Sequence, residues 1–483
     1  MNKWWFIFLS ISGYASAQSK SMLIHRMLQK YYQQDALNGC VLVASHHTIL
    51  YKHGFGKANF EWNIDNAVDT KFEIASISKL FTAVIVLKLI EDHKLSLEGK
   101  ITDYIPDYPK DNGDKISIDQ LLLHRSGLTD SRFIQGFETT EGMESKTHHD
   151  HIDYFKDRPL LFEPGSRWSY SNFGYNLLAY IAEKISGKPF HQLLNEMIYA
   201  KANMKHSTSL EDPLLVSNLA SGYSIRFAEI QKGWYHDPSF TFGIGSVITT
   251  VEDYYKFWEA LNEGKILNLH SVQLLMTPKT STDTGESFGY GLYFDTFKIK
   301  HDSIKIIRTA GNHYGIHTLM YSIPDDHSLI LIFLNTKNAI VNISTPIMFE
   351  MADNITKLLH DAPITMPRDS YAHIFYKDEE RRGLAWALHH YLSLQKSKSC
   401  RENFTYLNRL GYYYLDHNKL EEAIEVFKLN IANYPQNGDG YDSLGEAYWR
   451  SGNKELAILN YTKAVSLDPS NDNAKQMLDK LKL

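Results

Sequence analysis

Hydrophobic and polar residues alternate in two short stretches near the start of the chain, residues 40–44 and 49–53. This period of two predicts a pair of strands joined by a polar turn. Apolar residues at helical spacing predict an amphipathic helix over residues 22–32 and a second helix from Ser76 to about His93. The apolar positions that define the second helix are Leu80, Phe81, Val84, Leu87 and Leu89.

The middle of the chain carries both kinds of pattern. Further helices are predicted at residues 118–124, 176–186 and 189–198, and further strands near residues 243–248, 290–293, 304–307, 317–322 and 328–335. Strands at both ends of this region with helices between them indicate one α+β sheet domain interrupted by a helical insertion. We place this domain at residues 18–360.

The C-terminal region repeats itself with a period of 34 residues. The recurring pairs are Gly411 and Gly445, Tyr414 and Tyr448, Ala423 and Ala457, and Pro435 and Pro469. Small residues let two helices approach closely, aromatic residues fill the gaps between units, and proline ends a helix. The pattern resembles the tetratricopeptide repeat and predicts two such repeats with a polar capping helix over residues 401–483. A linker with a degenerate helix, residues 361–400, precedes this module, which either binds a protein partner or only packs against the rest of the chain.

Residues 1–17 have the pattern of an export signal. Lys3 supplies a positive charge, residues 4–11 are apolar, and Ala15 and Ala17 form an A-x-A cleavage site. The apolar core is far shorter than the roughly 20 residues that span a bilayer, and no cysteine follows Ala17 to carry a lipid. We therefore expect a secreted or periplasmic protein that begins at Gln18 and has no stable membrane span, with an uncleaved anchor as the alternative.

The chain has 483 residues and a net charge of −6, from 50 basic and 56 acidic side chains. Because there is no basic surplus, nucleic acid is not an expected partner. Two cysteines, Cys40 and Cys400, cannot form a disulfide framework, and they are either buried thiols or one bridge. The cluster of His148, His149 and His151 has no identifiable distant ligands, so we expect a solvated loop there, and no metal or cofactor.

The first chemical motif is Ser76-Ile77-Ser78-Lys79. On a helix, positions i and i+3 share a face, so the Lys79 amine can reach the Ser76 hydroxyl. A serine needs such an adjacent base, because its hydroxyl is a weak nucleophile at neutral pH. The same spacing joins Ser393 to Lys396 in the helical tail. The spacing alone therefore does not identify a catalytic serine, and the surrounding elements have to support it.

Two further elements supply polar groups. In Tyr170-Ser171-Asn172, the phenol can relay a proton and the carboxamide can orient an amide substrate. In the stretch 308–312, an apolar strand meets a glycine, and such an edge can present a backbone N–H group to a developing oxyanion.

Taken in order, these elements resemble the active-site set of the serine β-lactamase and penicillin-binding protein superfamily, in particular the class C β-lactamase-like serine hydrolases. Residues 72–79, 121–128, 162–175 and 289–292 carry the longer matches. The resemblance covers roughly residues 25–355. It implies a β-lactamase/transpeptidase-like sheet flanked by helices, a helical subdomain, and a site between them that works through an acyl-enzyme without a cofactor.

By position, the resemblance makes Ser76 the nucleophile, Lys79 its general base or proton relay, and Tyr170 a second base that also activates the deacylating water. Which of Lys79 and Tyr170 takes the first proton stays open. The residues expected to contact substrate are Asn172, Thr309 and Gly311. The oxyanion hole is expected to consist of the backbone N–H groups of Ser76 and Asn312.

The third motif departs from the family pattern. Where the family places Lys or His first in a K-T-G or H-x-G triplet, this chain has Thr309-Ala310-Gly311. The missing cation would hold a substrate carboxylate, which argues against β-lactams and peptides that end in D-alanine. Arg308 or His313 are the candidates to replace the charge.

We therefore expect an exported serine hydrolase that acts on a small ester, amide or peptide, including cell-wall fragments, as an esterase, D-amino-acid peptidase or β-lactamase-like enzyme. The alternative is a catalytically weak or inactive homologue that binds partners through its cleft and repeats. Candidates for the wall of an acyl pocket are Trp168, Tyr223, Trp234, Tyr235 and Phe240. His124 is expected to be a structural hydrogen-bonding residue behind the cleft.

Overall fold

The structure is a computed structural model that describes residues 4–134, 144, 146–233, 237–300, 302–338, 344–397, 400 and 403–482. The described chain divides into two units. The first runs from the N-terminus to Lys337, apart from Ile225–Ile230, and continues over Ser344–Thr365. The second contains Ile225–Ile230, Asn338 and the helices that follow Met366.

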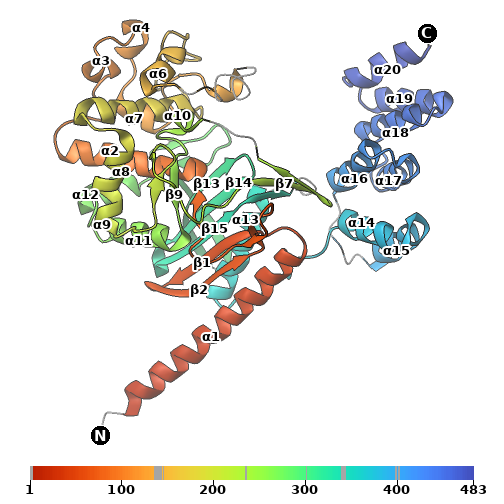
Figure 1. Ribbon diagram of the computed structural model, residues 1–483, viewed down its shortest axis with the longest axis horizontal. Helices are drawn as coiled ribbons and strands as arrows, with labels where there is room; N and C mark the ends of the chain where they lie inside the picture. Colours follow the sequence, from red (N-terminus) through yellow and green to blue (C-terminus); the bar gives the residue numbers. More distant parts are fainter. Residues whose placement is uncertain are drawn as a thin grey trace. The chain divides into compact units, whose positions relative to one another are not determined.

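The first unit is built on an eight-stranded antiparallel sheet with the strand order β10-β11-β12-β13-β14-β15-β1-β2 (Figure 1). Its strands are β1 (Gly39–Ser45), β2 (Thr48–Phe55), β10 (Thr280–Ser281), β11 (Ser287–Phe288), β12 (Tyr293–Ile299), β13 (Asp302–His313), β14 (Ile316–Ile323) and β15 (Ser328–Leu334). Strands β1, β14 and β15 are buried along their whole length. β1 and β15 carry apolar residues at successive positions because helices cover both faces of the sheet, with α13 (Ser344–Leu359) on β14 and α11 (Val251–Asn262) on β1.

Smaller strands lie outside this sheet. They are β3 (Lys57–Asn59), β4 (Ile64–Asp65), β5 (Phe72–Glu73), β6 (Thr208–Ser209), β7 (Tyr223–Arg226), β8 (Glu229–Lys232), β9 (Val247–Thr249) and β16 (Thr336–Asn338). Strand β9 pairs with β5 on one side and β6 on the other. Since β5 leads directly into the segment that holds Ser76, this small sheet fixes where that segment begins.

Two predicted strands start later than the pattern suggested. The stretch 290–293 is mostly a turn, closed by the Gly289 N–H group donating to the Leu292 carbonyl at 2.9 Å, and β12 begins only at Tyr293. Gly291 has φ +78° there, a backbone conformation that favours glycine. Likewise, 243–246 forms a turn in which the Gly245 N–H group donates to the Thr241 carbonyl at 2.8 Å.

The predicted helix after Ser76 is confirmed as α2 (Ser78–Glu91), which is buried along most of its length and packs against α7 (Asn172–Ser186). The remaining helices of this unit are α3 (Ile101–Tyr104), α4 (Lys110–Gly113), α5 (Ile118–Leu122), α6 (His148–Lys156), α8 (Phe190–Leu194), α9 (Ala200–Ala202), α10 (Pro238–Thr241) and α12 (Leu269–Leu275). A π turn over Asn195–Tyr199 joins α8 to α9, and short 3-10 turns lie at Ala75–Ile77, Ser131–Phe133 and Pro324–Asp326. Most of these helices contribute side chains to one large apolar core, and together they form the helical part of an α+β fold.

Helix α1 (Trp4–Gln33) is longer than the predicted amphipathic segment. Its later turns pack on β2 and α13, where Ile24, Met27 and Leu28 are buried and the Tyr31 hydroxyl donates to Glu350 Oε1 at 2.7 Å. The earlier turns extend beyond the sheet in Figure 1. Across the described part of the chain, no helix combines the length and the apolar character needed to cross a membrane.

A solvated loop was expected for the histidine cluster, but the cluster lies on helix α6. The His148 ring stacks on Phe242 at 3.8 Å between ring centres, and His148 Nδ1 lies 2.8 Å from Glu183 Oε2. His151 is buried among the rings of Phe240 and Phe242, and this burial lowers its pKa to about 4. Thr147 caps the helix by accepting from the Asp150 N–H group, so the polar run starts a helix. No group of three or more metal-ligating side chains occurs among the described residues.

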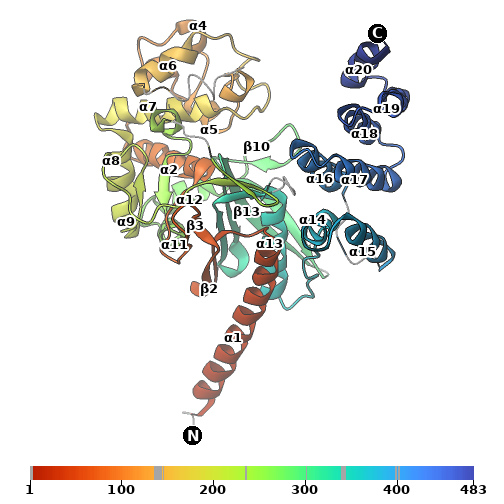
Figure 2. The ribbon, with the colours of Figure 1, turned by 45° about the vertical axis from the view of Figure 1, so that its right-hand side comes forward.

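From Met366 onwards the described part of the second unit is helical (Figure 2). Its helices are α14 (Tyr371–Arg382), α15 (Leu384–Ser397), α16 (Phe404–Asp416), α17 (Leu420–Asn433), α18 (Gly438–Arg450), α19 (Lys454–Leu467) and α20 (Asp472–Lys482). Helices α16 to α19 form two successive antiparallel pairs, as the repeat predicts. A Cβ atom on Gly411 would lie 2.3 Å from the Phe427 ring, so only glycine permits this helix approach. The pattern missed α14, and α20 is the predicted capping helix.

The two thiols lie in different units. The Cys40 thiol donates to the Ala67 carbonyl at 3.1 Å, and burial raises its pKa to about 12. Cys400 belongs to the apolar cluster of the second unit, together with Tyr406 and Leu407. Both are therefore buried side chains, the first of the two alternatives that the sequence leaves open.

Candidate active site

Ser76 lies in a short 3-10 turn, Ala75–Ile77, that leads into α2. The preceding residue, Ala75, has φ +49°, an uncommon conformation for a residue with a Cβ atom. This sharp entry lifts Ser76 out of the core, so that its side chain is partly exposed between the buried neighbours Ala75 and Ile77. This uncommon backbone conformation lies directly before the residue that carries the candidate nucleophile.

Lys79 lies one turn further along and is 3% exposed. Its Nζ atom donates to Ser76 Oγ at 3.2 Å and to the Ile244 carbonyl at 3.2 Å. The rings of Tyr170 and Tyr175 lie 5.0 and 5.9 Å from the same atom. The spacing of the motif thus places amine and hydroxyl in hydrogen-bond contact, and the tertiary structure adds a carbonyl that holds the amine in place.

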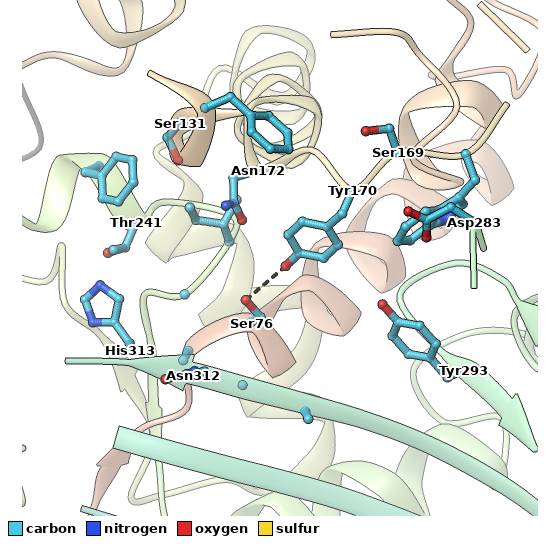
Figure 3. A pocket seen from close by; sticks show the side chains of 18 residues that line it. Ser76, Ser131, Ser169, Tyr170, Asn172, Thr241, Asp283, Tyr293, Asn312 and His313 are labelled. Atoms are coloured by element: carbon cyan, nitrogen blue, oxygen red, sulfur yellow. Dashed lines mark hydrogen bonds between the residues drawn. The ribbon is translucent and has the colours of Figure 1, made fainter. Parts of the chain in front are cut away.

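Tyr170 is 94 positions away from Ser76 in the sequence and adjacent to it in the fold. Its hydroxyl donates to Ser76 Oγ at 3.0 Å, the dashed line in Figure 3. Ser76 Oγ therefore has two hydrogen-bonding groups around it, one on Lys79 and one on Tyr170. Either group can take the serine proton or return it, so the geometry leaves the order of proton transfer open.

Asn172 is the first residue of α7, and the helix start fixes its position. Ser171 caps the helix by accepting from the Gly174 N–H group at 3.2 Å and donates its hydroxyl to the Thr129 carbonyl. The Asn172 N–H group donates to Asp130 Oδ2 at 2.6 Å, and Asp130 is fully buried. A carboxylate at a helix N-terminus is stabilised by the helix dipole. Asp130 could not be predicted from the sequence, because no motif connects it to Asn172.

His124 lies behind Tyr170, as expected for a structural residue. Its Nδ1 atom accepts from the Ser171 N–H group at 3.2 Å. Its ring centre lies 4.4 Å from that of Tyr170 and 4.9 Å from that of Tyr175. His124 thus helps to hold the phenol that reaches Ser76, and it does not line the cavity described below.

Strand β13 brings the third motif beside Ser76. A Cβ atom on Gly311 would lie 2.5 Å from the Ile74 carbonyl and 3.0 Å from the Ser76 nitrogen, so glycine allows the strand to approach the nucleophile. Thr318 on the neighbouring strand donates its hydroxyl to the same Ile74 carbonyl at 2.8 Å. Asn312 follows Gly311 at the cavity edge, so the two backbone segments expected to form an oxyanion hole are neighbours.

The two candidates for the missing cation have different positions. Arg308 is not a cavity residue; it forms an ion pair with Glu286, and its guanidinium lies 4.9 Å from the Phe349 ring. His313 does line the cavity, with Nδ1 3.6 Å from Glu73 Oε1. Thr309 is buried and lies outside the cavity lining, although substrate contact was expected of it.

These elements enclose a cavity of about 710 Å³. The residues that line it are Ala75, Ser76, Ser131, Phe133, Trp168, Ser169, Tyr170, Asn172, Phe240, Thr241, Ile244, Gly245, Asp283, Tyr293, Ala310, Gly311, Asn312 and His313. In Figure 3, Asn172, Thr241 and His313 lie on one side of Ser76, while Tyr170, Asp283 and Tyr293 lie on the other. Such a cleft has the size of a small-molecule site.

The sequence located only part of this wall. Trp168 and Phe240 line the cavity as predicted, whereas Tyr223 packs on Phe60 outside it. Trp234 and Tyr235 lie outside the described residues. The lining residues that the sequence analysis did not identify include Ser131, Phe133, Ser169, Thr241, Asp283 and Tyr293. They come from turns, loops and the ends of elements that meet only in the folded chain.

Comparison with known proteins agrees with this geometry. The family model of beta-lactamases matches residues 24–343, more than half of the chain, and the chain belongs to this family. A tetratricopeptide repeat model matches residues 439–471. The first unit is therefore a serine hydrolase fold of the β-lactamase and penicillin-binding protein type, followed by a tetratricopeptide-type helical region.

Among the relatives, penicillin-binding protein PbpX of Bacillus subtilis (strain 168) is 28% identical over 271 residues, which is 56% of this chain and 66% of that protein. The teichoic acid D-alanine hydrolase of Staphylococcus aureus is 22% identical over 315 residues, covering 65% of this chain and 74% of the relative.

Solved structures show the same architecture. A penicillin-binding protein from Bacillus halodurans matches with a TM-score of 0.59 and 25% identity over 68% of this chain and 99% of its own. The D-amino acid amidase from Ochrobactrum anthropi SV3 matches with a TM-score of 0.61 and 22% identity, covering 71% of this chain and 99% of the amidase.

Proposed function

We propose that this protein hydrolyses an ester or amide through an acyl-enzyme formed on Ser76. The observation that carries the proposal is the pair of hydrogen bonds to Ser76 Oγ, at 3.2 Å from Lys79 Nζ and 3.0 Å from the Tyr170 hydroxyl. In this mechanism, Ser76 Oγ attacks the substrate carbonyl while Lys79 or Tyr170 takes its proton. The proton then goes to the leaving group, and water activated by Tyr170 releases the acyl group.

Three neighbouring groups support the chemistry. In the proposed reaction, the backbone N–H groups of Ser76 and Asn312 donate to the oxyanion. Stabilisation of the oxyanion is the largest electrostatic contribution to catalysis in most acyl-transfer enzymes. The Asn172 carboxamide lines the cavity and orients the substrate. Gly311 leaves room for this arrangement, because any side chain there would meet the Ile74 carbonyl and the Ser76 nitrogen.

The substrate we favour is uncharged where the family pattern holds a carboxylate. Among the cavity-lining residues that the structure describes, no lysine or arginine is present, and His313 is the one basic side chain. The names of two relatives, a teichoic acid D-alanine hydrolase and a D-amino acid amidase, point to esters and amides of D-amino acids as substrates to test first.

We further propose that the protein is exported, with cleavage after Ala17. Among the residues of α1 whose burial the structure describes, 19–33, the first buried one is Ile24, which lies beyond the proposed cleavage site. Mass spectrometry of the protein recovered from outside the cytoplasm should give the mass of a chain that starts at Gln18.

The direct test is intact-protein mass spectrometry after exposure to a fluorophosphonate, a penicillin and a short-chain activated ester. We expect one adduct on the wild type and none on Ser76→Ala. Ser393→Ala is the matched control, because Ser393 and Lys396 repeat the same spacing on α15, where Ser393 is exposed. Absence of every adduct from the wild type would instead support a binding role for the cleft and the repeats.

A further inference from the structure

The cavity has one side chain whose charge the mechanism does not use. Asp283 is the only carboxylate among the described residues that line the cavity. It lies across Ser76 from His313, on the same side as Tyr170 and Tyr293 (Figure 3). The family pattern offers a cation in the cavity, which binds a substrate carboxylate. This cavity offers a carboxylate instead, which would bind a substrate cation.

A tightly hydrogen-bonded turn presents Asp283. The turn joins β10 to β11, and in it the Thr282 N–H group donates to the Glu286 carbonyl at 2.8 Å while the Gly285 N–H group donates to the Thr282 carbonyl at 3.0 Å. The Thr282 hydroxyl accepts from the Glu286 N–H group at 3.0 Å. Because these bonds cross the turn on both sides of Asp283, they hold its backbone at the edge of the cavity.

The same turn is fastened to the strand of the third motif. Arg308 on β13 forms an ion pair with Glu286, and it lies 3.6 Å from Asp295 Oδ2. Thus Arg308, a candidate for the missing cation, pairs with Glu286 and Asp295. Through Glu286 it also holds the turn that carries Asp283. Glu286 and Asp295 do not line the main cavity, so among its described lining residues the acidic charge comes from Asp283 alone.

The Asp283 carboxylate itself is exposed and has no hydrogen bond or ion pair with any residue that the structure describes. Two arginines line a smaller cavity that also borders Asp283. Arg125 donates to the Gly165 carbonyl, and the guanidinium of Arg167 lies 4.6 Å from the Phe162 ring. Neither pairs with Asp283, which leaves its charge available to a ligand in the main cavity.

For the reaction proposed above, the leaving group is expected on the side of Ser76 on which Asp283 lies. The atom that leaves must receive a proton from Tyr170 or Lys79, and the Tyr170 hydroxyl reaches Ser76 from the side of Asp283. Two aromatic side chains, Trp168 and Tyr293, line the same cavity, and Trp168 also borders the smaller one beside Asp283. An aromatic face next to a carboxylate is a favourable environment for an organic cation.

We propose that Asp283 selects substrates whose leaving group carries a positive charge, such as esters of amino alcohols or amides of basic amines. This inference rests on the proposed acyl-enzyme reaction at Ser76, and it names the class of leaving group for that reaction. Asp283 is a specificity-determining residue in it: the carboxylate attracts the cation, and the aromatic side chains cover its apolar surface.

The test uses two thioesters of the same shape that differ only in charge. Acetylthiocholine has a cationic leaving group, and S-(3,3-dimethylbutyl) thioacetate is its neutral counterpart. Released thiol is measured for the wild type, Asp283→Asn, Asp283→Lys and Ser76→Ala. We expect the wild type to favour acetylthiocholine by about tenfold in kcat/KM, the size of an effect near 1.4 kcal/mol. Asp283→Asn should remove this preference and Asp283→Lys should reverse it.

The kinetic signature separates specificity from a merely structural role. Because the ion pair acts on the bound substrate and the transition state alike, Asp283→Asn should raise KM for acetylthiocholine and leave kcat nearly unchanged. Added salt should reduce the wild-type preference. The control is Asp302→Asn, an exposed carboxylate at the far end of β13, which should behave as the wild type.

A second measurement does not depend on turnover. Choline should protect Ser76 from fluorophosphonate labelling at a lower concentration than 3,3-dimethylbutanol in the wild type, and at equal concentration in Asp283→Asn. Equal protection in the wild type, or equal turnover of the two thioesters, would overturn the role of Asp283 while leaving the acyl-enzyme intact. If Ser76 neither reacts with the probe nor supports turnover, the proposed function fails, and this inference fails with it.

Discussion

At the scale of single residues, the site depends on short contacts between groups that are far apart in the chain. Ser76 and Lys79 share one helix face, but Tyr170 reaches Ser76 Oγ from 94 positions away. The Ile244 carbonyl orients Lys79, and the buried Asp130 carboxylate fixes the start of the helix that carries Asn172. Each reactive side chain therefore has a second residue that holds it.

The hydrogen bond from Lys79 leads to a kinetic prediction. Lys79→Ala removes a base that contacts Ser76 Oγ, so the rate of fluorophosphonate labelling at Ser76 should fall by about 10² to 10⁴. Lys396→Ala is the matched control, because Lys396 completes the same spacing with Ser393 on α15. Labelling of Lys79→Ala at the wild-type rate, in a protein with unchanged circular dichroism, would show that Tyr170 alone activates the serine.

At the scale of elements, α6 packs a titratable group into the core behind the cavity. His151 is 4% exposed among aromatic rings, two of which belong to Phe240 and Phe242. Near it, burial raises the pKa of Glu211 to about 7. Burial lowers the pKa of His148, but the hydrogen bond to Glu183 and the charges of both acids outweigh it and leave that pKa raised.

His151 makes the stability of the first unit depend on pH. Its pKa is lowered from 6.5 to about 4 in the folded chain, so the neutral form is favoured by folding. Its contribution is therefore complete above pH 6.5 and is lost as the pH falls from 6.5 to 4, by up to about 3 kcal/mol. Urea unfolding of the first unit at several pH values, followed by pulse proteolysis, measures this loss.

The variant His151→Gln should remove this part of the pH dependence. Glu211 and His148 titrate in both proteins, so their effects cancel in the difference between wild type and variant. His149→Gln is the control, because His149 is on the same helix with a side chain that is 51% exposed. A wild-type curve parallel to that of His151→Gln between pH 7 and pH 4 would contradict the buried neutral histidine.

At the scale of the whole molecule, the chain consists of two units with separate cores. Every residue that lines the cavity belongs to the first unit. The second unit depends on close contacts between the helices of its repeats, with glycines facing aromatic rings. Damage to the repeats should therefore leave the reactivity of Ser76 unchanged.

Three glycines in the repeats test this independence. A Cβ atom would lie 2.3 Å from its nearest neighbour at Gly411, 3.0 Å at Gly445 and 3.3 Å at Gly440. Gly411→Ala should destabilise the second unit by about 1–3 kcal/mol, and Gly445→Ala and Gly440→Ala should cost less, because more space is left there and alanine favours the helix over glycine. Thermal unfolding measures the loss, and fluorophosphonate labelling should stay at the wild-type rate. Loss of labelling in Gly411→Ala at a temperature where the first unit is folded would contradict the separation.

The sequence predicted the elements whose signal is local. Apolar periodicity located α2, β1, β14 and β15, because burial on both faces leaves a continuous or helical apolar pattern. The period of 34 located the repeats, since each unit must present small and aromatic residues at fixed places to stack on the next. The pattern failed at the strand expected over 290–293, where the turn around Gly291 breaks the pairing, and at the histidine cluster, whose polar residues were mistaken for a loop.

What the sequence by itself determined is the fold class and the identity of Ser76, Lys79, Tyr170 and Asn172 as the residues of interest, because their motifs are short and contiguous. Only the tertiary structure decided the environment of these residues. Asp283 reaches the cavity on a turn between β10 and β11. The ion pair that ties this turn to Arg308 depends on the pairing of strands in the folded sheet. Spacing along the chain predicts which side chains share a helix face, but the charge and shape of a cavity depend on long-range packing, which no local pattern encodes.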